Sequence, residues 1–138
     1  MTDTAQIIEP LAKFHSPVYK NGRIAIPSNE RDYYGLDQHD IVLLIVRNNN
    51  GRGLFWAQLT VHGRLTIPRG LRRELGISEG DFVEVLLIDI IKVKDMMGEE
   101  GYNVLKAIRT NSYRLLTPDE EIEIIKHPKT KISFSTDK

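Results

Sequence analysis

Residues 61–77 of this 138-residue chain read Val-His-Gly-Arg-Leu-Thr-Ile-Pro-Arg-Gly-Leu-Arg-Arg-Glu-Leu-Gly-Ile. The dipeptide His62-Gly63 precedes a short β-type segment that stops at Pro68, because proline cannot donate to a sheet ladder. Residues 69–75 fit a short helix, with proline near its start and Gly76 just after its end. The stretch therefore predicts a tight turn, a strand and a capped helix, and it carries four arginines.

A second copy of this pattern lies 41 residues upstream. Asn21-Gly22 stands at the turn, and this dipeptide is a strong hairpin signal because both residues tolerate positive φ. Residues 28–34 can form two helical turns, and Gly35 suits the residue with left-handed backbone conformation that often follows the end of a helix. Identical residues fall where the backbone is most demanding, so we interpret the pattern as an internal duplication. The identical pairs are Phe14 and Phe55, Gly22 and Gly63, Arg23 and Arg64, Ile26 and Ile67, Pro27 and Pro68, Arg31 and Arg72, Gly35 and Gly76, Asp40 and Asp81, and Val42 and Val83.

The duplication divides the chain into segments. Each repeat ends in an apolar β-type run, and a segment rich in Asn and Gly separates the two repeats. That segment carries two arginines, and nothing in it could build a core. We expect an N-terminal arm at residues 1–13, a first repeat at 14–46, a flexible linker at 47–54, a second repeat at 55–91 and a C-terminal extension at 92–138.

The C-terminal extension has helical signals. Apolar residues recur at helical spacing within residues 99–109, which predicts an amphipathic helix. Thr117, followed by Pro118 and acidic residues, is a typical helix start, so a second helix should run to about Lys126. Residues 129–138 alternate weakly, which fits either an added edge strand or a frayed end.

The composition limits the class of protein. Hydrophobic residues make up 41% of the chain and charged residues 28%, which is ordinary for a globular protein. Nineteen basic and nineteen acidic residues give zero net charge, which argues against a polybasic membrane binder but leaves room for a local basic face. The apolar runs are too short to span a membrane, and the N-terminus lacks the features of a signal peptide. We therefore expect a cytoplasmic protein.

Motifs for other chemistry do not occur in the sequence. Without cysteine there are no disulfides and no thiolate chemistry. The four histidines are scattered without metal-ligand spacing, and neither a phosphate-binding glycine loop nor a nucleophile motif is present. We expect no enzymatic activity, no catalytic residue and no bound metal or cofactor.

The second repeat closely resembles the SpoVT/AbrB swapped-hairpin domain. The matching residues are Gly63-Arg64, Ile67-Pro68, residues 71–77, Gly80-Asp81 and Val83-Glu84-Val85. The first repeat looks like a degenerate copy, and together the matches cover residues 14–91. In that family, two units interleave into one barrel. The resemblance implies a mostly β fold with short helices, namely an AbrB-like swapped-hairpin β-barrel formed by two tandem ββαββ-type repeats. The helical signals of residues 92–138 add a helical C-terminal extension to this expected fold. We expect the repeats to interleave within one chain.

The resemblance also implies binding of duplex DNA through arginines near the turns and on the short helices. Arg64, Arg72 and Arg73 match the family's basic positions, and we expect these three to matter most. In the first repeat, Asp32 replaces the second helix arginine. The bland alternative is a solvated helix face that is paired with nearby carboxylates. The full candidate set for DNA binding is Arg64, Arg72, Arg73, Arg69, Arg23, Arg31 and Lys20.

The expected function is that of an AbrB-like transcriptional regulator with double-stranded DNA as its partner. The alternative is a protein-interaction module, such as an antitoxin-like or scaffold barrel that acts through its C-terminal extension. The extension could also serve a homo-oligomer. Its helical signals and mixed charge count against an antitoxin, because antitoxin tails of that family are usually disordered and acidic.

Overall fold

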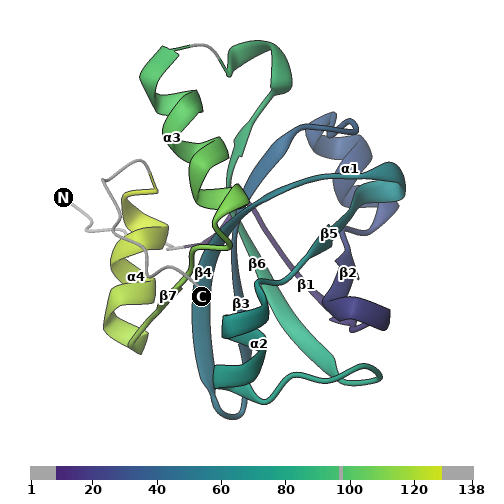
Figure 1. Ribbon diagram of the computed structural model, residues 1–138, viewed down its shortest axis with the longest axis vertical. Coiled ribbons are helices and arrows are strands. Elements are labelled where there is room, and N and C mark those ends of the chain that lie inside the picture. Colours follow the sequence, from purple (N-terminus) through teal and green to yellow (C-terminus); the bar gives the residue numbers. More distant parts are fainter. Residues whose placement is uncertain (1–8, 97, 129–138) are drawn as a thin grey trace, which may run out of the picture.

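Figure 1 shows the computed structural model of the protein, which describes residues 9–96 and 98–128. The strands are β1 (Ala12–Pro17), β2 (Arg23–Ala25), β3 (Ile41–Asn48), β4 (Gly51–Gln58), β5 (Arg64–Thr66), β6 (Phe82–Ile91) and β7 (Arg114–Leu115). The α-helices are α1 (Ser28–Tyr34), α2 (Arg69–Leu75), α3 (Gly98–Arg109) and α4 (Pro118–Lys126). Short 3₁₀ turns lie at Lys20–Gly22, Val61–Gly63 and Val93–Asp95.

Strands of one repeat pair with strands of the other. The large antiparallel sheet has the order β1-β6-β3-β4-β7, and β2 and β5 form a separate two-stranded ribbon. Phe14 of β1 pairs with Val85 of β6, and Leu44 of β3 pairs with Phe55 of β4. A shift of 41 residues exchanges these two pairs. The repeats are therefore interleaved about a pseudo-twofold axis within the chain.

The main core lies between the large sheet and the ribbon. Most buried residues in this layer have a counterpart 41 positions away that is also buried. The pairs are Phe14 and Phe55, Val18 and Leu59, Ile24 and Leu65, Ile26 and Ile67, Leu36 and Ile77, Val42 and Val83, Leu44 and Val85, and Val46 and Leu87. Because a segment as short as one repeat buries too little surface to fold alone, each repeat completes the core of the other.

The C-terminal extension covers the opposite face of the large sheet, with α3 and α4 on the side away from the β2–β5 ribbon (Figure 1). Leu43 and Ile45 of β3 are fully buried on this face, where they belong to one apolar cluster with Leu116 and Ile124 of the extension. Strand β3 is thus buried on both faces. This explains why residues 41–46 form an unbroken apolar run instead of an alternating one.

Both predicted turns have positive φ at the two expected residues. The φ values are 65° at Asn21, 74° at Gly22, 59° at His62 and 68° at Gly63. Each loop has one residue more than a two-residue hairpin turn. A backbone hydrogen bond closes it, from the Tyr19 amide to the Arg23 carbonyl in the first repeat and from the Thr60 amide to the Arg64 carbonyl in the second. The strands on either side of each turn belong to different sheets.

The four predicted helices are confirmed, with small changes at their ends. Both α1 and α2 occupy the expected residues and end at a left-handed glycine, with φ of 61° at Gly35 and 64° at Gly76. Helix α4 begins after Thr117 in a reciprocal cap with Glu120, in which each side chain accepts a hydrogen bond from the other residue's amide.

Two expectations about the fold class are corrected. Helices and strands account for similar shares of the described residues, so the fold is mixed and not mostly β. The two longest helices, α3 and α4, come from the extension, which the resemblance does not cover. The sheet also does not close into a barrel, because β1 and β7 stand at its edges and the ribbon forms a sheet of its own. Strands β2 and β5 have three residues each and pair with each other, and the outer edge of β4 is instead paired with β7 of the extension.

The predicted linker at residues 47–54 is instead a tight hairpin turn with the adjoining parts of β3 and β4. Pairing continues to Asn48 and Gly51, which leaves only Asn49 and Asn50 between the strands. The side-chain amides of Asn48 and Asn50 donate to the Leu75 carbonyl at the end of α2, at 2.8 and 2.9 Å. Asn and Gly suit a tight turn as well as a flexible linker, and composition alone does not separate the two.

The ends of the chain also differ from expectation. Strand β1 begins at Ala12, so residues 12 and 13 of the predicted arm belong to the large sheet. The first part of that arm, residues 1–8, and the weakly alternating segment 129–138 lie outside the described residues. Within the described residues, no helix is both long and apolar enough to cross a membrane.

Candidate nucleic-acid interface

The two arginines that follow the turns lie close together on the β2–β5 ribbon. Ile24 pairs with Leu65 at the centre of the ribbon, and both side chains are buried in the core. Since side chains alternate along a strand, Arg23 and Arg64 project from the opposite, exposed face. They are diagonal neighbours in the register, a placement typical of Cβ atoms about 7–8 Å apart. Within the described part of the chain, neither side chain makes a hydrogen bond or an ion pair.

A second pair of arginines fastens the short helices to the turns. Arg31 Nε donates to the Ile26 carbonyl at 3.1 Å, and Arg72 Nε donates to the Ile67 carbonyl at 3.0 Å. Each side chain lies against the turn glycine of the other repeat, so that a Cβ there would overlap it; the two contacts are Arg31 with Gly63 and Arg72 with Gly22. Both arginines are half-buried. Their first role is therefore structural, which the sequence analysis missed.

The same contacts determine which turn lies beside which helix. Ile67, just before α2, donates its amide to the Gly22 carbonyl at 3.0 Å, and Ile26, just before α1, donates to the Gly63 carbonyl at 2.9 Å. The turn of the first repeat therefore lies beside the helix of the second, and the reverse. Figure 1 shows the second crossing, with the start of β5 beside α1.

This crossing gathers the candidate residues into two groups with different charge. The basic end consists of Lys20 and Arg23 at the first turn with Arg69, Arg72, Arg73 and Glu74 on α2. The mixed end consists of His62 and Arg64 at the second turn with Glu30, Arg31 and Asp32 on α1. The predicted residues are thus not brought together as one set. Arg64 lies apart from Arg72 and Arg73, although all three belong to the second repeat.

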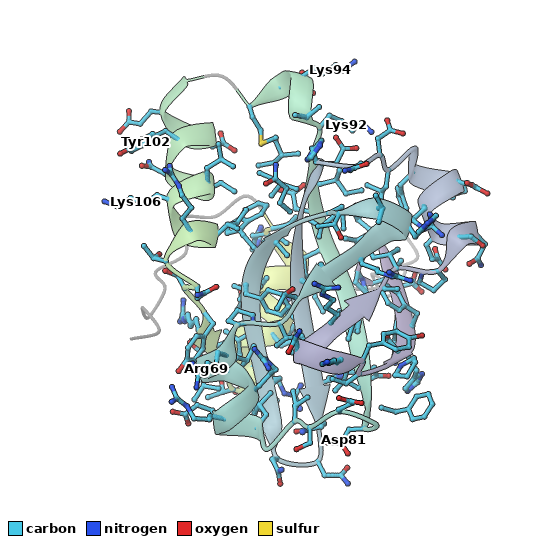
Figure 2. All side chains as sticks on the ribbon, turned by 45° about the vertical axis from the view of Figure 1, so that its right-hand side comes forward. Arg69, Asp81, Lys92, Lys94, Tyr102 and Lys106 are labelled. Atoms are coloured by element: carbon cyan, nitrogen blue, oxygen red, sulfur yellow. The ribbon has the colours of Figure 1, made fainter. Side chains whose placement is uncertain are left out.

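The exposure of these residues follows the helix geometry. On α2, Leu71 and Leu75 are buried, and Arg69 and Arg73 are exposed one turn apart. Figure 2 shows Arg69 on α2 and places it well away from Lys94 and Lys106, which lie on the extension. Lys20 is exposed in the first turn.

The two arginines of the predicted linker belong to a different cluster. Arg47 donates to Glu84 of β6 and to Glu121 of α4, the latter at 2.7 Å, and Arg52 Nη1 lies 3.0 Å from Glu121 Oε1. The hydrogen bond from Arg47 holds the pKa of Glu84 below its usual value, against the effect of burial, and Lys13 adds to it. Glu121 is almost fully buried, so this network anchors α4 to the sheet. It faces away from the ribbon.

A buried carboxylate joins the extension to the first repeat. Asp40 accepts hydrogen bonds from the amides of Asp37 and Val93, at 2.8 and 2.9 Å, and from Lys92 Nζ. Burial alone would raise the pKa of Asp40, but these hydrogen bonds outweigh it and hold the pKa below its usual value. Lys92 also donates to the Gly35 carbonyl at the end of α1. The matching Asp81 is exposed, and within the described residues its carboxylate accepts a hydrogen bond only from the Ser78 amide.

Comparison with known proteins finds a structural relative. The sequence matches no protein-family model and no curated protein. The structure is similar to "the solution structure of PHS018 from Pyrococcus horikoshii", with a TM-score of 0.58 and 39% sequence identity. The match covers 61% of this chain and 96% of PHS018.

Proposed function

We propose that this protein, which belongs to the same family as PHS018, binds duplex DNA through the exposed face of the β2–β5 ribbon and the helices beside it. One observation carries the proposal: Arg23 and Arg64 are diagonal neighbours on the exposed face of a two-stranded ribbon, and their side chains have no partners in the described chain. Exposed arginines without carboxylate partners are available to an anionic ligand. The alternative is a solvated face whose arginines are paired with nearby carboxylates, and Arg23 and Arg64 form no such pairs within the described residues.

The chemistry of this face suits DNA. A guanidinium presents a planar fork that can bridge two phosphate oxygens or the O6 and N7 atoms of guanine. The major groove of B-DNA admits a two-stranded β-ribbon, and the ribbon here carries an arginine on each strand. Phosphate contacts would provide most of the affinity and make it dependent on salt. Because the net charge of the chain is zero, this attraction must come from a local group of cations.

The finer identity is also a proposal. The repeats interleave strand by strand, as the resemblance to the SpoVT/AbrB swapped-hairpin domain implies, and this supports an AbrB-like transcriptional regulator acting in the cytoplasm. The apolar face of α4 packs on its own sheet through Ile124, so the extension is already engaged within the chain. This counts against the alternative in which the extension is an open segment that captures a protein partner.

A salt series tests the proposal. The affinity of the wild-type protein for a random-sequence duplex is measured by fluorescence anisotropy between 50 and about 200 mM salt, the range over which such contacts are strongly screened. The test variant is Arg23→Glu with Arg64→Glu. The matched control is Lys94→Glu with Lys106→Glu, which makes the same change in net charge on the extension.

We expect wild-type affinity to fall steeply with salt. Loss of two phosphate contacts should make the negative slope of log K against log salt shallower by about 1.8, and the control should keep the wild-type slope. Equal losses in both variants would show that only net charge matters. No wild-type binding at low salt would contradict DNA binding and favour the protein-interaction module.

A further inference from the structure

We infer that DNA binding by this protein is one-ended: the basic end supplies the dominant contacts with duplex DNA, and the mixed end contributes little. This inference rests on the proposed function and concerns how the same face is used. It also means that the binding site is composite, because its turn comes from the first repeat and its helix from the second.

The charges of the two ends differ although their backbones match. The basic end carries five basic side chains and one acidic one, whereas the mixed end carries two of each. Three substitutions between the repeats produce the net difference, because Glu74 (matched by Tyr33) and Glu30 (matched by Leu71) offset each other. At positions related by 41 residues, Lys20 is matched by Val61, Arg69 by Ser28, and Arg73 by Asp32.

Neighbouring loops do not cancel this difference. The loop next to the first turn carries Glu79 and Asp81, and the loop next to the second carries Asp37 and Asp40. Each turn therefore has two acidic residues in the equivalent neighbouring loop. Lys92 lies against Asp37 and Asp40 and offsets part of their charge. Even so, the total at the mixed end stays well below that at the basic end.

The geometry then assigns unequal roles to two equivalent arginines. Arg23 and Arg64 occupy the same position on their strands and are both exposed. A phosphate at Arg23 also lies in the field of Arg69 and Arg73, which share the exposed side of α2. A phosphate at Arg64 meets the field of Glu30 and Asp32 on α1. Like-charge repulsion therefore weakens the contact at Arg64.

Two matched variants test the inference, Arg23→Ala and Arg64→Ala, with a random duplex at about 0.1 M salt. Arg23→Ala should weaken binding about tenfold. It should also make the negative slope of log K against log salt shallower by about 0.9, as expected for one lost phosphate contact. Arg64→Ala should change affinity less than about threefold, because that contact is already weakened by the neighbouring carboxylates. Thermal melting of both variants checks that neither loss comes from unfolding.

A gain-of-function variant removes the remaining ambiguity, since misfolding cannot raise affinity. Asp32→Arg gives the mixed end the arginine that α2 has at Arg73. It should strengthen binding severalfold and make the loss caused by Arg64→Ala as large as that caused by Arg23→Ala. Asp32→Asn, which removes only the acid, should give a smaller gain.

The outcomes separate the two proposals. Equal losses for Arg23→Ala and Arg64→Ala in the wild-type background, or no gain from Asp32→Arg, would overturn one-ended binding and leave DNA binding intact. Absence of wild-type binding at low salt would overturn both. A larger loss at Arg23, together with a gain at Asp32→Arg, supports the composite basic end.

Discussion

The two repeats have the same backbone plan but different surfaces. Their helices have equal length and end at matching left-handed glycines, and each uses an arginine to hold the turn of the other repeat. The core layer is likewise built from matched pairs. The charge differences lie on the exposed sides of the turns and short helices, and within the core α2 adds Leu71 and Leu75 where α1 has no buried residue. The shared features are therefore those that the fold requires, and the differing side chains are those that give each repeat its own surface.

The two short helices show this contrast most clearly. Helix α2 buries Leu71 and Leu75, whereas α1 has no buried residue. Leu71 packs so closely on β4 that a Cβ at Gly53 would overlap it. The end of α2 is capped by two asparagine side chains, and the end of α1 by Lys92. Helix α2 is thus anchored by two fully or nearly fully buried leucines, whereas α1 packs on the core through the partly buried Tyr34 and is capped by Lys92 of the extension.

The largest expected effect comes from removing the anchor of α2. Leu71→Ala should destabilise the protein by about 2–5 kcal/mol, because the side chain is fully buried and truncation leaves a cavity. The matched position in α1 is Glu30, and Glu30→Ala should change stability by less than about 0.5 kcal/mol. Denaturant unfolding measures both. Similar losses at the two positions would contradict the difference in anchoring.

A smaller effect is expected from the paired aspartates. Asp40→Asn should cost about 1.5–3 kcal/mol, because a buried carboxylate loses charge-assisted hydrogen bonds, including that from Lys92. The matched variant Asp81→Asn should cost less than about 0.5 kcal/mol, because that residue is exposed. A loss at Asp81 as large as that at Asp40 would show that the extension does not distinguish the two repeats.

The lowered pKa of Asp40 predicts that its contribution to the free energy of unfolding depends on pH. Because the pKa of Asp40 is lower in the folded protein than its usual value of 3.8, its stabilising effect is complete well above that value. The effect is lost as the pH falls through the lowered pKa of the folded state. The difference in unfolding free energy between wild type and Asp40→Asn should therefore be constant near neutral pH and shrink below about pH 4. A difference that grows on acidification would contradict this assignment.

The sequence predicts those features that depend on local backbone geometry. Gly22 and Gly63 stand at positive φ, and Gly35 and Gly76 end their helices, because few other residues tolerate these conformations. The capped start of α4 at Thr117 is local in the same sense. Such requirements restrict the residue types within a short stretch of sequence, so they can be recognised without a structure.

Tertiary features of the interface could not be predicted in this way. The sequence groups Arg64 with Arg72 and Arg73 because they are neighbours in the chain, whereas the crossing of turns and helices puts Arg64 at the other end. The asparagines at residues 48–50 suggest flexibility, but their role depends on the distant carbonyl of Leu75. Both facts depend on contacts between residues far apart in sequence.

If duplex DNA docks on the basic end of the interleaved repeats, amides at that end should respond most strongly to added DNA. Nuclear magnetic resonance titration of the 15.8 kDa chain with a short duplex tests it most directly. The largest amide shift changes should lie at residues 19–23 and 69–75, with smaller changes at 60–64 and 28–34. Equal changes at the two ends would contradict one-ended binding, and changes confined to α3 and α4 would contradict the proposed DNA-binding face itself.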